Sequence, residues 1–170
     1  ISAIVGAEIR PEQHAKLKET AEGIGVPFLT QPRRKSATYN EFVELIKSFQ
    51  PDMIIVNSYS MLIPEEILVI PAKGAINIHG ALLPEYRGAN PIQWAILNEE
   101  NVTGVTMHYM TEQFDAGDIV AQRKVPIFFE DTWIDVQARI AEASEQMLKD
   151  EIPKLLEGTN LRHSQNETHA

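Results

Sequence analysis

Three side chains in the middle of the sequence have the types and spacing needed to act on a carbonyl group. Asn77 and His79 lie two positions apart at the end of a short apolar run, and Asp115 follows further along the chain. Residues two apart on a β-strand point to the same face. An amide and an imidazole that converge there can stabilise a developing oxyanion and move a proton.

Asp115 is the candidate for a third group that sets the protonation state of His79. A predicted helix, 91–97, and a predicted strand, 104–110, lie between them, and one crossover followed by a turn brings Asp115 back to the same sheet edge. A carboxylate beside an imidazole favours the charged ring, so it raises the His pKa and lowers its own. The chain has no cysteine and no Gly-x-Ser-x-Gly turn. We therefore expect the attacking amine to come from a substrate.

Three segments around these residues form a specific combination: 77–91 reads NIHGALLPEYRGANP, 103–106 reads TGVT and 115–119 reads DAGDI. Together they resemble the 10-formyltetrahydrofolate-dependent formyltransferases, most densely from about residue 51 to 125. The resemblance implies that an amine attacks the formyl carbon of 10-formyltetrahydrofolate. It also implies that Asn77 and His79 hold the oxyanion, that Asp115 tunes the histidine, and that no metal is needed.

The resemblance further implies two loops that bind the pterin ring, largely through main-chain groups. The cofactor-binding residues expected in these loops are Tyr59, Ser60, Met61, Leu62, Ile63, Pro64, Met110, Thr111, Glu112 and Phe114. The residues expected to bind the acceptor substrate are Arg87, Gly88, Asn90, Gln93 and Trp94.

Several of these residues also have simpler interpretations. Arg87 could instead tie down a turn, Gly88 serves backbone geometry, and Trp94 could be a core residue of its helix. His108 could join His79 and Asp115 as a metal ligand, but without a tight ligand pattern we expect a strand residue with no chemical role.

The identity of the acceptor is argued from charge. A formal net charge of −9 with a pI near 5 argues against broad contact with nucleic acid, whose backbone is bound mainly by Lys and Arg. The basic run Arg33-Arg34-Lys35 is interpreted as solvated surface. Formylation of tRNA in this family uses an appended C-terminal domain, of which these residues show no trace, and segment 89–94 resembles nucleotide-sugar N-formyltransferases. We therefore expect a nucleotide-linked amino sugar as acceptor.

Three alternatives to this function stay open. They are a methionyl-tRNA formyltransferase, a hydrolase that releases formate from the folate by admitting water, and a noncatalytic folate-binding fragment. The sequence also leaves a homodimer open.

Alternating strand and helix patterns predict an α/β fold, a Rossmann-like mostly parallel sheet with helices on both faces. The strands are expected at 1–5, 26–29, 52–57, 75–78, 104–110 and 121–127, and the helices at 11–24, 41–49 with Asn40 as its cap, 91–97 and 133–156. Family members begin with a further strand, turn and helix, so we expect this catalytic domain, 1–158, to lack its first βα unit. A polar, loose tail is expected from 159 to 170.

Composition sets the outer limits. With 170 residues, 44% hydrophobic and 23% charged, the chain suits one globular domain. No apolar run approaches the roughly 20 residues of a membrane span, and no secretory signal is visible. We therefore expect a cytoplasmic protein with no membrane contact.

Overall fold

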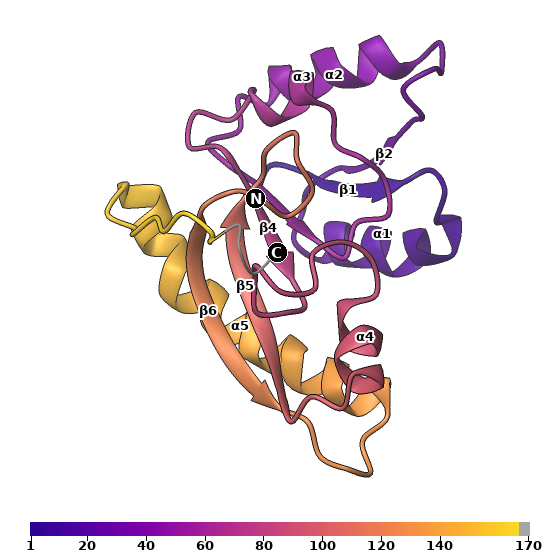
Figure 1. Cartoon of the computed structure of the whole chain (residues 1–170). Helices are drawn as coiled ribbons and strands as arrows, with labels where there is room; N and C mark the ends of the chain where they lie inside the picture. The colour runs from indigo at the N-terminus through magenta and orange to yellow at the C-terminus, as the bar shows by residue number, and fades with distance from the viewer. Residues whose placement is uncertain (167–170) are drawn as a thin grey trace. The chain divides into compact units, whose positions relative to one another are not determined.

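The computed structural model describes residues 1–166, and the chain divides into two compact units. The first comprises Ile1–Pro51 and Tyr59–Ala72, and the second comprises Asp52–Ser58 and the chain from Lys73 onward. Both units combine strands with helices (Figure 1), which confirms the α/β class. Within residues 1–166, none of the helices has the length and apolar character of a membrane span.

The first unit contains a parallel pair of strands, β1 (Ile4–Ala7) and β2 (Phe28–Gln31). The 3-10 turn η1 (Pro11–Gln13) and helix α1 (His14–Gly23) connect them, as parallel strands require a crossover. Two further helices complete the unit, α2 (Tyr39–Ser48) and the short α3 (Glu65–Leu68).

Helix α2 begins earlier than the sequence predicts. Asn40 lies inside the helix, Thr38 occupies the capping position, and no side chain caps the end. The prediction of Asn40 as the cap is therefore wrong. The earlier start buries Tyr39, whose hydroxyl donates to Glu66 Oε1 at 3.2 Å, so a tertiary contact overrides the local capping preference.

The second unit is built on a four-stranded sheet in the order β3-β4-β5-β6. Its strands are β3 (Ile54–Asn57), β4 (Ala75–His79), β5 (Val102–Tyr109) and β6 (Ile119–Pro126). β3 and β4 are parallel, whereas β4-β5 and β5-β6 are antiparallel. The sheet is thus mixed, and helix α4 (Pro91–Leu97) connects two antiparallel strands. The expected crossover between His79 and Asp115 does not form.

Strict alternation along β4 and β5 separates an apolar face of this sheet from a polar one. Ile76, Ile78, Val105 and Met107 pack in one core cluster with helix α5 (Trp133–Glu157), which runs along the sheet in Figure 1. Full burial of each such side chain contributes about 1.5–3 kcal/mol. The intervening residues, which include Asn77, His79, Thr106 and His108, lie on the opposite face.

Both ends of α5 carry a local helix-end signal. A capping box between Thr132 and Asp135 opens the helix, and Gly158, with φ +73°, closes it. The chain then returns to the sheet: His163 and Ile119 exchange two backbone hydrogen bonds of 2.9 and 2.8 Å. Part of the tail expected from 159 to 170 therefore pairs with the sheet, and residues 167–170 lie outside the described residues.

Candidate active site

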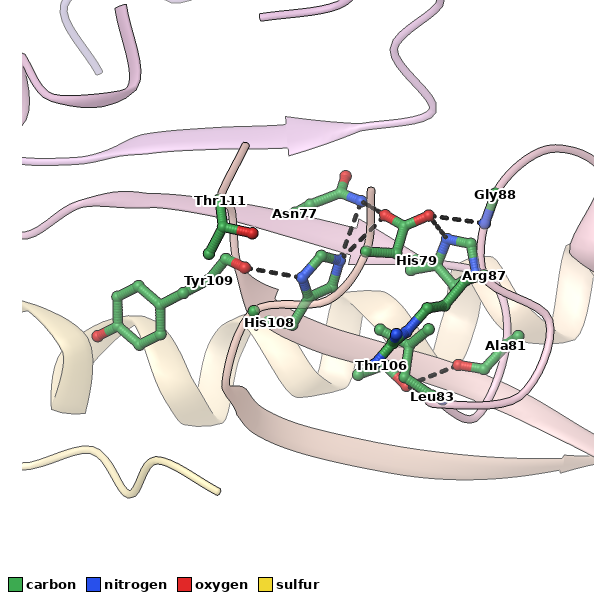
Figure 2. A network of polar contacts seen from close by, with 12 residues as sticks. Asn77, His79, Ala81, Leu83, Arg87, Gly88, Thr106, His108, Tyr109 and Thr111 are labelled. Atoms are coloured by element: carbon green, nitrogen blue, oxygen red, sulfur yellow. Dashed lines mark hydrogen bonds and ion pairs between the residues drawn. The ribbon is translucent and has the colours of Figure 1, made fainter. Parts of the chain in front are cut away.

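The polar face of the sheet brings Asn77, His79 and His108 together. Asn77 lies opposite His108 in the antiparallel register of β4 and β5, and His79 lies opposite Thr106. Figure 2 shows the three side chains pointing toward one another. Both imidazoles are almost fully buried, with 7% of the His79 side chain and 2% of the His108 side chain exposed. The predicted convergence of Asn77 and His79 on one face is observed.

Asp115 reaches this face on the loop 110–118, which folds back between β5 and β6. The loop begins and ends on backbone hydrogen bonds, from Met110 N to Ala75 O at 2.8 Å and from Tyr109 N to Asp118 O at 2.9 Å. Asp115 itself has φ +50°, a left-handed conformation that Asp adopts more readily than most residues. The loop between the antiparallel strands β5 and β6 therefore brings Asp115 to this face, where the sequence predicted a crossover followed by a turn.

The Asp115 carboxylate is the centre of the site. Its Oδ1 lies 3.2 Å from Asn77 Nδ2 and 3.4 Å from His108 Nε2, while its Oδ2 lies 2.9 Å from Gly88 N and 3.5 Å from His79 Nδ1. Burial raises the pKa of Asp115, but the contacts with His108, His79 and the Gly88 N–H outweigh burial and bring the pKa to about 2. The carboxylate is therefore ionised at neutral pH, as predicted.

The pKa of His79 is set by opposing effects. Burial lowers the pKa of His79 and outweighs the Asp115 charge and the Tyr86 hydrogen bond, which raise it, while His108 adds to the lowering. The Asp115 charge does raise the pKa of His79, as predicted, but the net shift is downward, because the sequence does not show how deeply the ring is buried. Its Nε2 lies 2.8 Å from the Tyr86 carbonyl, which can only accept, so the neutral ring donates from Nε2 and keeps a lone pair on Nδ1.

Asn77 and His108 complete the network. His108 Nδ1 lies 2.9 Å from the Tyr109 carbonyl, so it carries a proton, and Nε2 can accept from Asn77 Nδ2 at 3.2 Å. The second N–H of Asn77 donates to Asp115. His108 therefore helps to fix the amide orientation of Asn77. The sequence analysis did not predict this role, since it expected His108 to be a strand residue with no chemical role. The alternation Thr106-Met107-His108 was the available signal, since it puts two polar side chains on one face of their own strand.

The residues predicted to bind the acceptor lie just after this network. Arg87 donates to Gln165 Oε1 from Nε and Nη2, at 3.1 and 2.7 Å. Gly88 has φ +90°, so it does serve backbone geometry. Asn90 precedes helix α4 with φ +57°. Trp94 is 54% exposed, so it is not a core residue of that helix. Substrate binding by these residues and Gln93 stays a prediction.

The two predicted pterin loops belong to different units. In the first unit, the Tyr59 hydroxyl donates to Gln31 Oε1 at 2.9 Å, and Gln31 Nε2 donates to the Leu62 carbonyl at 3.2 Å. In the second unit, Thr111 closes a small turn by donating to the Gln113 carbonyl at 3.1 Å, and Phe114 is largely exposed. Main-chain recognition of a pterin by either loop remains a prediction. Among residues 1–166, the acidic, histidine and cysteine side chains form no group of three or more suited to a metal ion.

Comparison with known proteins gives the family. The formyl transferase family model matches residues 4–152, most of the chain. A methionyl-tRNA formyltransferase of Lysinibacillus sphaericus is 37% identical over 99% of this chain and 55% of its own length. The chain belongs to the formyl transferase family, and it spans about half the length of the curated relatives it matches.

Solved structures agree with this assignment. Phosphoribosylglycinamide formyltransferase from Bacillus halodurans aligns with a TM-score of 0.80 at 29% identity, covering 92% of this chain and 80% of that one. The formyltransferase PseJ from Anoxybacillus kamchatkensis, in complex with UDP-4,6-dideoxy-4-formamido-L-AltNAc and tetrahydrofolate, aligns with a TM-score of 0.69 at 26% identity, covering 97% and 81%. The predicted fold and family are confirmed.

Proposed function

We propose that this protein transfers a formyl group from 10-formyltetrahydrofolate to a primary amine, with Asn77, His79 and Asp115 as the catalytic residues. The observation that carries this proposal is the Asp115 carboxylate, which contacts both Asn77 Nδ2 and His79 Nδ1 on the polar face of one sheet. The family and the tetrahydrofolate in the PseJ structure support the donor.

The reaction needs one carbonyl addition and one proton transfer. The amine nitrogen forms a bond to the formyl carbon, and the carbonyl electrons move to its oxygen. Collapse of this tetrahedral oxyanion breaks the bond from carbon to N10, and the proton lost by the amine ends on N10. The products are a formamide and tetrahydrofolate, so no oxidant or second group is consumed.

The side chains of the site suit both steps. Asn77 can donate to the oxyanion by exchanging one of its two N–H contacts, to His108 or Asp115, for the substrate. Neutral His79 can take a proton on Nδ1, because the resulting cation has an acceptor at each nitrogen, the Tyr86 carbonyl and the Asp115 carboxylate. Burial keeps the ring neutral until that proton arrives, and Asp115 then stabilises the charge.

The relatives favour methionyl-tRNA as the acceptor. Eight curated relatives at 36–39% identity are all methionyl-tRNA formyltransferases. This reverses the order expected from the sequence, where a nucleotide-linked amino sugar came first. The lack of an appended C-terminal domain in these residues does not bear on the acceptor, because the chain spans only about half the length of those relatives.

An amino-sugar nucleotide remains the second candidate. Trp94 is exposed, so packing in the core does not account for this side chain. The PseJ structure, solved with a formamido-sugar nucleotide, aligns over 97% of this chain. An aromatic ring at the surface can stack on a base or a sugar ring.

The test is turnover of 10-formyltetrahydrofolate by the complete protein with methionyl-tRNA, a panel of UDP- and dTDP-linked amino sugars, and phosphoribosylglycinamide. We expect formylation of methionyl-tRNA to be fastest. Faster transfer to a sugar nucleotide would reverse the choice of acceptor. Formate release without any acceptor, at a rate similar to transfer, would identify a hydrolase, and folate binding without turnover would indicate a binding protein.

A further inference from the structure

The chain beyond helix α5 lies along the active-site loop as a strap formed by residues 160–166. The strap holds Tyr109 at one end of loop 110–118: the Asn160 amide donates to the Tyr109 hydroxyl at 3.2 Å, and the Arg162 guanidinium lies 3.7 Å from the ring centroid. It holds Ile119 at the other end through the two backbone hydrogen bonds of His163. The loop that carries Asp115 is therefore held at both of its ends.

Gln165 contacts the loop itself. Its Nε2 donates to the backbone carbonyls of Asp115 and Gly117, at 2.7 and 2.8 Å. Its Oε1 accepts from Arg87 Nε and Nη2, at 3.1 and 2.7 Å. Both N–H groups and both lone pairs of the amide are thus used. These partners fix the orientation of the amide, because a reversed group would turn its N–H donors toward the guanidinium and its oxygen toward the carbonyls.

The restraint on Asp115 acts close to the carboxylate. Asp115 has a left-handed backbone conformation, with φ +50°, which few non-glycine residues adopt without external support. The hydrogen bond from Gln165 to its carbonyl, together with the one to Gly117, provides such support on both sides of Ala116. The direction in which the Asp115 side chain leaves the backbone depends on this conformation.

The contact with Arg87 restrains the facing segment. Arg87 follows Tyr86, whose carbonyl accepts from His79 Nε2, and precedes Gly88, whose N–H donates to Asp115 Oδ2. One side-chain amide therefore ties together the two segments that contact His79 and Asp115 from either side.

We propose that Gln165 is a positioning residue of the formyl-transfer site: its amide sets the distance between the Asp115 carboxylate and His79 by holding the Asp115 loop against the Arg87 turn. This inference rests on the proposed function, in which that pair stabilises the developing charge. Gln165 does not contact the reacting atoms and acts only through Asp115 and Arg87.

A pair of substitutions separates the two halves of the amide. Gln165→Glu keeps an acceptor for Arg87 but replaces the NH2 group, which supplies both N–H donors, with a single oxygen that faces the Asp115 and Gly117 carbonyls. Gln165→Ala removes both contacts. Ser164→Ala is the matched control, because Ser164 lies in the same strap and donates only to the Asp118 side chain, at 3.2 Å.

The groups that face His79 are the Asp115 carboxylate, the Tyr86 carbonyl and the His108 ring. If Asp115 moves away from His79, the ring loses the neighbour that most favours its protonated form. A displaced Asp115 therefore moves the acidic limb of the pH–rate profile to lower pH. Loss of folded protein reduces the rate equally at every pH and leaves the limb in place.

The experiment measures kcat, KM and the pH profile of these variants in the complete protein, with 10-formyltetrahydrofolate and the fastest acceptor of the panel above. We expect Gln165→Glu and Gln165→Ala to lower kcat about tenfold, equivalent to about 1.4 kcal/mol, with a smaller change in KM. We expect both to shift the acidic limb to lower pH, while Ser164→Ala stays within about twofold of the parent.

Two results would overturn the inference: wild-type kcat in Gln165→Glu, or a reduced rate with an unshifted limb. Asp115→Asn, measured beside them, separates the two proposals. If Asp115→Asn is fully active, the proposed site itself is wrong. If Asp115→Asn is impaired while Gln165→Glu is not, only the role of Gln165 is wrong.

Discussion

Asp115 Oδ2 lies 3.5 Å from Nδ1 of His79, and this contact opposes the burial of the ring. Burial lowers the pKa of His79, and the carboxylate raises it toward its ordinary value without cancelling the effect of burial. The pKa of Asp115 is about 2, so the carboxylate is charged at neutral pH. The pair thus holds a neutral base next to a fixed negative charge.

The first prediction concerns that charge. Asp115→Asn keeps the shape of the side chain but removes the group that favours protonated His79, so the pKa of His79 falls further. We expect kcat to drop by at least tenfold, and the acidic limb of the pH–rate profile, where the rate is lost as His79 becomes protonated, to move to lower pH. The pH–rate profile of the purified variant is the measurement.

Asp118→Asn is the control for this change, because Asp118 lies on the same loop and its side chain contacts Ser164 instead. It should leave the limb in place. An unshifted limb and full activity in Asp115→Asn would reduce Asp115 to a residue that ties down the Gly88 turn.

A second prediction tests the oxyanion and proton-transfer groups. Asn77→Ala and His79→Ala each remove an interaction that is strongest in the transition state, so each should lower kcat by about 10²-fold or more with a smaller change in KM. Steady-state kinetics at saturating donor measure both effects. Asn101→Ala, at an exposed turn, is the asparagine control. Activity within threefold of the parent for both site variants would remove the pair from the mechanism.

The third prediction concerns His108, which orients the Asn77 amide. Gln places its terminal polar group near the position of Nε2 and can keep the contact with Asn77, whereas Asn places its group near Nδ1 and keeps only the contact with the Tyr109 carbonyl. We therefore expect His108→Gln to retain several times more kcat than His108→Asn. Thermal melting of both variants provides the correction for stability, since the site is buried. Equal kcat in the two folded variants would show that the Nε2 contact does not matter.

The sequence was sufficient for the parts of this site that depend on local periodicity. The two-residue period of β4 predicts that Asn77 and His79 share a face, and the apolar residues between them predict the face buried against α5. The ends of α5 also follow from local signals, at Thr132 and Gly158.

Features that depend on tertiary pairing could not be predicted in this way. The partnership of His108 with Asn77 requires the antiparallel register of β4 and β5, which no local pattern specifies. The lowered pKa of His79 depends on how deeply the ring is buried, which the sequence does not show. Gln165 lies in a polar segment without helix or strand periodicity, so its contacts with Asp115 and Arg87 are visible only in the folded chain.

The last prediction concerns the space around the Asp115 loop. A Cβ atom added at Gly117 would lie 2.0 Å from the Tyr109 carbonyl oxygen and 2.8 Å from the Tyr109 carbonyl carbon, and a backbone group cannot move aside as a flexible side chain can. Gly117→Ala must therefore shift the loop, and with it Asp115, two residues earlier. We expect kcat to fall at least tenfold and the melting temperature to fall as well.

Gly23→Ala is the matched control, since a Cβ at Gly23 in helix α1 has nothing within 4 Å and alanine is the better helix former. It should leave kcat unchanged and keep or slightly raise the melting temperature. Wild-type kinetics in Gly117→Ala would mean that the loop tolerates displacement, and that the distance between Asp115 and His79 does not limit the reaction.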